Sequence, residues 1–135
     1  MLDDFNFLIE RDPENALLVA AEQWKQTRFE AEVLSPEHDG REIKNIVLAG
    51  MGGSALAGLI AKKWLESEIS QPFEIIRDYS LPKSVSKNTL VIASSYSGNT
   101  EETLSTLDQA QKIGAQIATI SAHGKLEQIA KQNDI

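Results

Sequence analysis

The chain has 135 residues, a formal net charge of −7 and no cysteine; 41% of its residues are hydrophobic and 24% are charged. Its length suits one domain around one core, and its composition is ordinary for a soluble globular protein. The absence of cysteine excludes disulfide bonds and thiolate metal sites, and His38 and His123 alone do not favour a histidine metal site. The acidic charge argues against a nucleic-acid partner. No apolar run reaches membrane-spanning length and the acidic start differs from a signal peptide, so we expect a cytoplasmic protein without a membrane partner.

Residues 1–40 are predicted to form an arm and one helix. The arm, residues 1–11, carries apolar side chains among acids and is expected to pack against another surface. Asp12 followed by Pro13 is typical of an N-cap and a first helical position. Apolar residues at helical spacing then predict one face of a helix that runs to about residue 33, with Trp24 in the core: Leu17, Ala20, Ala21, Trp24 and Ala31. The polar stretch 35–40 predicts a loop.

Residues 41–135 are predicted to be an α/β domain, which forms one compact domain together with residues 1–40. Four short apolar runs predict strands, and the segments between them have helical spacing and are long enough for parallel pairing. We therefore expect a parallel sheet flanked by helices on both faces, with right-handed connections. The second strand keeps charged residues and is expected near an edge. The expected strands are 43–49, 73–79, 89–93 and 115–120, and the last helix, after a turn at residues 123–124, is marked by Leu126, Ile129 and Ala130.

The first predicted strand runs into a glycine-rich loop at residues 50–55. Glycines let the backbone approach a ligand, and Ser54 has a hydroxyl that can cap the next helix or bind an oxyanion. One interpretation is a tight turn from strand to helix with a capping serine. Another is a dinucleotide-binding loop, because the loop fits the pattern G-x-G-x-x-A, with Asp78 as a ribose acceptor. Asp78 follows at a somewhat larger offset than the usual one of about 20 residues.

The third predicted strand ends in a loop rich in hydroxyls, residues 94–102, that opens a helix ending at Gly114. Hydroxyls and N–H groups at a helix start attract anions, and such loops meet at the carboxyl edge of a parallel sheet. The loop is therefore predicted to hold a phosphate with Ser95, Ser97 and Thr100. A capping box formed by Asn99 and Glu102 is the alternative, and it explains only part of the polar side chains.

Two further groups near this edge receive structural interpretations. Glu101 and Glu102 fall in the first turn of the helix, where acids interact favourably with the helix dipole, so they are not expected to be catalytic bases. His123 follows the fourth strand and can reach the same edge, although a histidine in a turn more often has no contact with a ligand.

The two loops resemble those of the SIS (sugar isomerase) domain family, and in particular the first SIS domain of the bifunctional phosphoglucose/phosphomannose isomerases. The matching stretches are Gly50-Met51-Gly52-Gly53-Ser54 and Ser94-Ser95-Tyr96-Ser97-Gly98-Asn99-Thr100-Glu101-Glu102-Thr103, together with the Trp24-bearing helix. The resemblance implies a three-layer α/β sandwich around a five-stranded parallel sheet. It also implies that a sugar phosphate binds without a metal or a nucleotide cofactor, with its phosphate held by Gly52, Gly53, Ser54, Ser95, Ser97 and Thr100.

The activity implied by the resemblance is the reversible conversion of glucose 6-phosphate or mannose 6-phosphate to fructose 6-phosphate. In the family, a glutamate after the first domain is the base and a histidine from a partner subunit assists. No catalytic residue is therefore expected in this chain, which we expect to be a fragment of a longer one, to lack the last strand of its sheet and to be inactive alone. The fourth strand would then be an exposed edge.

Several partners and functions stay open at this point. The family implies a homodimer or the pairing of this domain with a second SIS domain. A phosphosugar-sensing regulatory module without catalysis is the main alternative function, and a dinucleotide-binding domain is the third.

Overall fold

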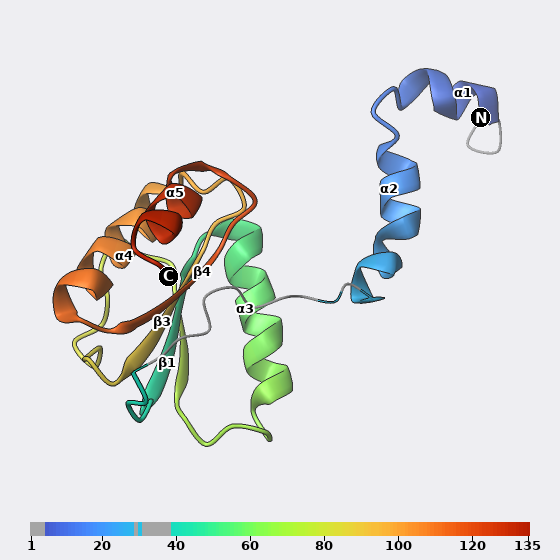
Figure 1. Cartoon of the computed structure of the whole chain (residues 1–135). Coiled ribbons are helices and arrows are strands. Elements are labelled where there is room, and N and C mark those ends of the chain that lie inside the picture. Colours follow the sequence, from blue (N-terminus) through green and yellow to red (C-terminus); the bar gives the residue numbers. More distant parts are fainter. Residues whose placement is uncertain (1–4, 29, 31–38) are drawn as a thin grey trace. The chain divides into compact units, whose positions relative to one another are not determined.

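The structure is a computed structural model that describes residues 5–28, 30 and 39–135, and the chain divides into two units, residues 1–34 and 35–135. The first unit consists of short helices (Figure 1): α1 (Phe5–Arg11), α2 (Ala16–Glu22) and the 3-10 helix η1 (Gln23–Arg28). Part of the expected arm is thus helical. Most of the predicted loop 35–40, including His38, lies outside the described residues.

The prediction of one long helix from Pro13 is wrong, because the helix begins later, at Ala16, and changes to a 3-10 helix at Gln23. Asn15 adopts a left-handed conformation with a φ of 54°, which ends the turn after Asp12 and delays the helix to Ala16. The Asp12 carboxylate still serves this helix start, because it accepts hydrogen bonds from the N–H groups of Ala16 and Leu17 at 2.7 and 2.8 Å. Trp24 is not a core residue: its side chain is 54% exposed, and the Arg28 guanidinium lies 4.9 Å from the centre of its ring.

The second unit contains a four-stranded sheet in the order β2-β1-β3-β4, in which every neighbouring pair is parallel. This confirms the predicted fold class, and the charged second strand lies at an edge as expected. The fourth strand forms the other edge. The strands are β1 (Asn45–Gly50), β2 (Phe73–Ile76), β3 (Thr89–Ser94) and β4 (Gln116–Ile120). The helices are α3 (Gly52–Leu65), α4 (Glu101–Ile113) and α5 (Gly124–Gln132).

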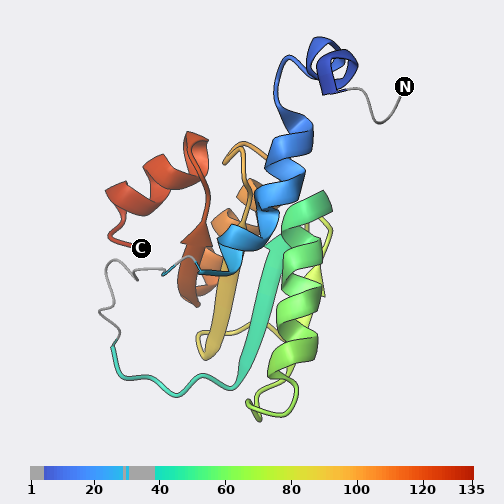
Figure 2. The same ribbon diagram turned by 90° about the vertical axis from the view of Figure 1, so that its right-hand side faces the viewer.

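The helices cover both faces of the sheet, with α3 on one face and α4 and α5 on the other (Figures 1 and 2). Side chains alternate along β1, so that Val47 joins a cluster on the α4 face with Val91 and Ala110. A second cluster joins both helices of that face to the sheet through Ala93, Leu107 and Leu126. On the opposite face α3 packs closely, since a Cβ atom at Gly58 would lie 2.9 Å from the Leu48 side chain.

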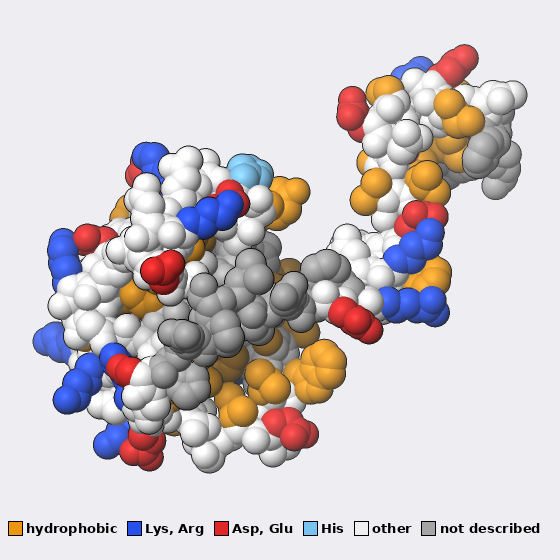
Figure 3. Space-filling model, viewed as in Figure 1, with side chains coloured by type: hydrophobic (Ala, Val, Ile, Leu, Met, Phe, Trp, Pro, Cys, Tyr) orange, Lys and Arg blue, Asp and Glu red, His pale blue; other side chains and the backbone are white. Residues whose placement is uncertain are grey.

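The outer side of α3 is apolar and exposed. Hydrophobic side chains gather over this helix in Figure 3. They form a patch, here called the α3 patch, in which Ile60 is 62% and Trp64 is 78% exposed: Leu56, Leu59, Ile60, Trp64 and Leu65. An apolar patch of this kind is typical of a surface that another protein element covers. Among the described residues, no helix combines the length and the apolar character that a membrane crossing needs.

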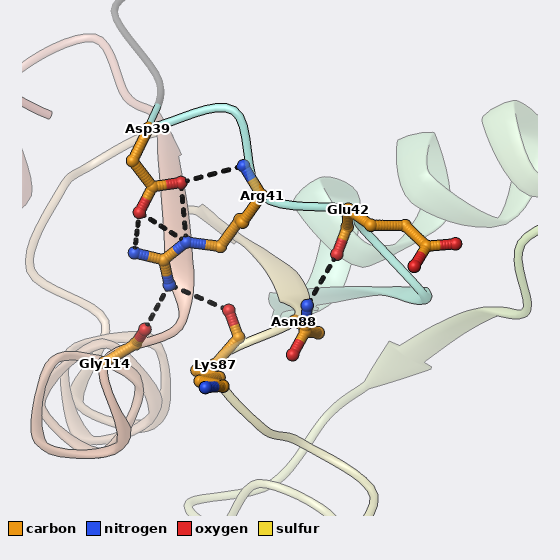
Figure 4. Close-up of polar contacts among 6 residues, drawn as sticks. All are labelled: Asp39, Arg41, Glu42, Lys87, Asn88 and Gly114. Carbon is orange, nitrogen blue, oxygen red and sulfur yellow. Dashed lines mark hydrogen bonds and ion pairs between the residues drawn. The ribbon is translucent and has the colours of Figure 1, made fainter.

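Arg41 fastens the segment before β1 to the end of the sheet where β3 and β4 begin (Figure 4). The two predicted loops follow the opposite ends of their strands. Its guanidinium donates hydrogen bonds to the backbone oxygens of Lys87, before β3, and Gly114, before β4, at 2.8 and 2.6 Å. It also donates from Nε to both carboxylate oxygens of Asp39. Gly114 has a φ of 75° and ends α4, as predicted, with its N–H bonded to the last turn of the helix.

Leu107 should contribute strongly to stability, because its side chain is 1% exposed between α4, α5 and the sheet. We expect Leu107→Ala to lower the free energy of unfolding by about 2–5 kcal/mol, through lost burial and the cavity left behind. Ile113→Ala on the same helix is the matched control, since Ile113 is 42% exposed. Urea unfolding measures both variants, and equal losses would contradict this packing.

The Asp39–Arg41 pair should make stability depend on acidity. The Arg41 hydrogen bonds lower the pKa of Asp39 from 3.8 to about 2, so the pair stabilises the fold above pH 4 and this contribution is lost as the pH falls through about 2. We expect Arg41→Ala to lower the thermal midpoint by a few degrees at pH 7 and by less at pH 2, where a large part of the Asp39 carboxyl is protonated and the carbonyl contacts make up most of the loss. Arg77→Ala, at another exposed arginine, is the control. A difference that stays constant with pH would contradict the role of the carboxylate.

Candidate functional site

The two predicted loops start from neighbouring residues on adjacent strands. In the register of β1 and β3, Gly50 pairs with Ser94, and these are the last residues of the two strands. A Cβ atom at Gly50 would lie 2.8 Å from the Ser94 backbone oxygen, so only glycine permits this close approach. From here the chain leaves toward α3 on one face and α4 on the other. This is the switch point at which ligands bind in open α/β sheets.

The first loop is shorter than predicted, because α3 already begins at Gly52. Gly52 has a φ of 52°, Gly53 follows it, and both are exposed with open space where a side chain would be. Ser54 does not cap the helix; its N–H donates to the Met51 oxygen, and the N-cap Met51 makes no side-chain capping bond. Since the first N–H groups of a helix have no acceptor within it, Gly52 and Gly53 present N–H donors at the start of α3.

The second loop brings together the three hydroxyls that the sequence singles out. The Oγ of Ser95 lies 2.8 Å from the Oγ1 of Thr100 and 3.5 Å from the Oγ of Ser97, and it accepts the N–H of Gly98 at 3.1 Å. Ser95 is 2% exposed, whereas Thr100 is half-buried and Ser97 is exposed. The cluster thus extends from the protein interior to its surface at one helix start.

The start of α4 is not closed by the capping box that was the alternative prediction. Thr100 is the N-cap and makes no side-chain capping bond. Asn99 lies one position too early, and its Oδ1 accepts the N–H of Lys125, at the start of α5. The hydroxyl of Thr103 donates instead to the Ser94 oxygen at 3.4 Å, which ties the first turn of α4 to the end of β3. The capping prediction for Asn99 and Glu102 is therefore wrong.

A tyrosine that the sequence analysis did not single out lies beside the first turn of α4. The Tyr79 hydroxyl donates to Oε2 of Glu101 at 3.4 Å, and its backbone oxygen accepts bonds from Ser105 and Gln109. The charge of Glu102, followed by desolvation and the charge of Glu101, raises the pKa of Tyr79. The signal in the sequence was its position as the last residue of the predicted second strand, because the ends of parallel strands lie at the same edge of a sheet. In the structure β2 ends earlier, at Ile76, and Tyr79 follows it.

His123 lies beside the second loop. It is the N-cap of α5 and is exposed, and its ring meets that of Tyr96 edge-on with 5.9 Å between the ring centres. Among the described residues, no group of three or more histidine, aspartate and glutamate side chains is placed to hold a metal ion.

The chain is similar to enzymes that act on phosphorylated sugars. It is 45% identical over 92 residues to the bifunctional phosphoglucose/phosphomannose isomerase of Caldicellulosiruptor bescii. The aligned region covers 68% of this chain and 27% of that relative. The enzyme of the same name from Aquifex aeolicus is 46% identical over 90 residues, with 66% and 28% covered. The D-glucosamine-6-phosphate 4-epimerase of Sulfolobus acidocaldarius is 34% identical over 112 residues, with 82% and 34% covered. The chain therefore spans about a quarter to a third of the length of these relatives.

Solved structures show the same fold. Tagatose-6-phosphate ketose/aldose isomerase from Escherichia coli matches with a TM-score of 0.58 and 26% identity, over 70% of this chain and 28% of that one. The C-terminal domain of glucosamine-fructose-6-phosphate aminotransferase from Francisella tularensis matches with a TM-score of 0.56 and 24% identity, over 66% of this chain and 26% of that one, and supports the fold alone. The family model of the SIS domain matches residues 41–135. The chain belongs to the SIS domain family.

Proposed function

We propose that residues 41–135 bind a sugar phosphate at the edge of the sheet where β1 and β3 end, with residues 1–40 as an accompanying arm and helical segment. The phosphate is held from two sides, by residues that share a position at a helix start: Gly52, Gly53 and Ser54 on α3, and Ser95, Ser97 and Thr100 at α4. The observation that carries the proposal is the convergence of these two helix starts, neither of which has a side-chain cap.

The chemistry of this edge suits a dianion. Helix N-termini carry partial positive charge, and free N–H groups together with hydroxyls donate hydrogen bonds to phosphate oxygens. Glu101 accepts a hydrogen bond from the hydroxyl of Tyr79, which lies in the segment after β2. This contact supports the assignment of the first-turn acids to the structure of the helix.

We propose that the whole protein interconverts glucose 6-phosphate or mannose 6-phosphate with fructose 6-phosphate. After ring opening, a base moves a proton between C1 and C2 through an enediolate. The residues of this chain fix the phosphate and so position C1 and C2, and the base and its assisting acid come from outside these 135 residues. The similarity to the two bifunctional isomerases supports this proposal. We also propose a cytoplasmic location, because charged sugar phosphates are retained inside the cell.

We propose further that the α3 patch is covered in the whole protein, by a second copy or by a second SIS domain. The support is the exposure of Ile60 and Trp64, one helical turn apart, since large apolar side chains on one helix face are typical of a contact surface.

Removing a hydroxyl from either helix start should weaken binding of the sugar phosphate. We expect Ser54→Ala and Ser97→Ala each to raise the Kd for fructose 6-phosphate at least about tenfold, because each loses a hydrogen bond to a charged group. Ser67→Ala is the matched control, as Ser67 lies just beyond the opposite end of α3. Isothermal titration calorimetry measures all three. A folded wild-type chain that binds neither glucose 6-phosphate nor fructose 6-phosphate would contradict the proposal.

Binding and catalysis should separate between this chain and the whole protein. We expect the 135-residue chain to bind fructose 6-phosphate without isomerase activity, and the complete gene product to convert glucose 6-phosphate or mannose 6-phosphate. A coupled assay for fructose 6-phosphate formation measures both. A complete product that binds these sugars but never converts them would favour the sensing module instead.

A further inference from the structure

The loop of residues 94–100, here called the ligand loop, is held against residues 120–126, which run from the end of β4 into the first residues of α5 and are here called the turn between β4 and α5. Three backbone hydrogen bonds join the two segments. They run from Ser95 N–H to Ile120 O, from Ala122 N–H to Tyr96 O and from Leu126 N–H to Gly98 O, at 2.9, 3.1 and 2.9 Å. The residues of the turn are not among those proposed to hold the phosphate. This contact therefore fixes the position of the ligand loop through residues that do not bind the ligand.

Two glycines let the backbones of the loop and the turn come into direct contact. Gly98 has a φ of 66°, and a Cβ atom there would lie 1.7 Å from the His123 oxygen. Gly124 has a φ of 86°, and a Cβ atom there would lie 2.4 Å from the Ser97 oxygen. Each position therefore requires glycine both for its conformation and for its space. The position of the ligand loop therefore depends on that of the turn.

Asn99 links the turn between β4 and α5 to Ser97, one of the residues proposed to bind the phosphate. Its Oδ1 accepts the N–H of Lys125 at 3.2 Å, in the first turn of α5, where N–H groups have no acceptor within the helix. Its Nδ2 donates to the Ser97 oxygen at 3.0 Å, and its backbone N–H donates to the Ser97 hydroxyl at 3.3 Å. The bond from Nδ2 is a second side-chain bond, which a residue that only capped α5 would not need.

We propose that Asn99 is a positioning residue for phosphosugar binding, which orients Ser97 and the ligand loop by fastening them to the first turn of α5. The inference rests on the proposed function, because it concerns the same site. A loop that is already ordered loses less conformational freedom when the ligand binds, and the affinity is higher for that reason. The turn between β4 and α5 thus influences affinity without touching the ligand.

The test compares Asn99→Ala with a substitution of a second asparagine whose side chain also bonds α5, in the full chain. Asn133 donates from Nδ2 to the Ile129 oxygen at the far end of α5, so Asn133→Ala removes a side-chain bond of α5 without touching the loop. We expect Asn99→Ala to raise the Kd for fructose 6-phosphate about five- to tenfold, as for the loss of one or two hydrogen bonds, and Asn133→Ala to leave it unchanged.

A second readout reports the link itself. Amide exchange at Lys125, followed by NMR without ligand, should be faster in Asn99→Ala than in the wild type. Asn99→Asp keeps an oxygen acceptor and should restore slow exchange. Its added charge would itself weaken the binding of a phosphate, so weaker binding of this variant does not count as support. Should the alanine variant fail to fold, Asn99→Asp is titrated in its place: it lacks the Nδ2 donor to Ser97, and binding as tight as that of the wild type would overturn the proposal.

The results separate the inference from the function on which it rests. Weaker binding together with faster exchange at Lys125 in Asn99→Ala supports it. Unchanged binding overturns it, and so does weaker binding with unchanged exchange, because Asn99 would then act by touching the ligand. Equal weakening by Asn133→Ala also overturns it. Absence of binding by the wild-type chain would remove the proposed function as well, and the wild-type titration alone reveals that case.

Discussion

The geometry of the candidate site depends on how closely the ends of β1 and β3 approach. The two strands pair in register along their length, from Asn45 and Thr89 at one end to Gly50 and Ser94 at the other. The first pair is fixed by a hydrogen bond from Thr89 Oγ1 to Asn45 Oδ1 at 2.7 Å, and the last pair is free of a side chain on Gly50. Because both strands end at the same level, both helix starts lie at the same edge of the sheet. A larger residue at Gly50 would push the Ser94 backbone away and separate them.

The sheet and its helices could be predicted because their patterns are long and local. Apolar runs flanked by helical spacing predict buried parallel strands, and charged residues on the second strand indicate an edge. The N-terminal segment shows the limit of such patterns. Its periodicity indicates which residues share a helix face, but a single left-handed residue, Asn15, shifts the helix start, and periodicity does not detect it. Trp24 lies on the predicted face and is nevertheless exposed, since spacing does not reveal whether another element covers that face.

Within the site, the hydroxyls were predictable and their supports were not. Ser95, Ser97 and Thr100 lie within six residues, so the end of one strand brings them together. The Asn99 side chain accepts a hydrogen bond from Lys125, which lies 26 residues later in the sequence, and Tyr79 bonds Glu101, which lies 22 residues later. Contacts of this length follow from the order of the strands, which no local pattern encodes. The same reasoning explains why a capping box that fits the local spacing of Asn99 does not form.

The net charge of −7 is compatible with the anion site that we propose, because such a site would be built from dipoles. Lys112 pairs with Asp108 and Lys131 with Glu127 on their own helices, and each such exposed pair adds no net charge. Distant surface acids are screened over about 10 Å at ordinary salt, so they repel a bound phosphate weakly. N–H and O–H donors act only over short distances and at favourable angles. If the ligand loop binds a phosphate as we propose, affinity depends on how accurately the loop holds its donors, and its contact with the start of α5 then matters more than any single surface charge.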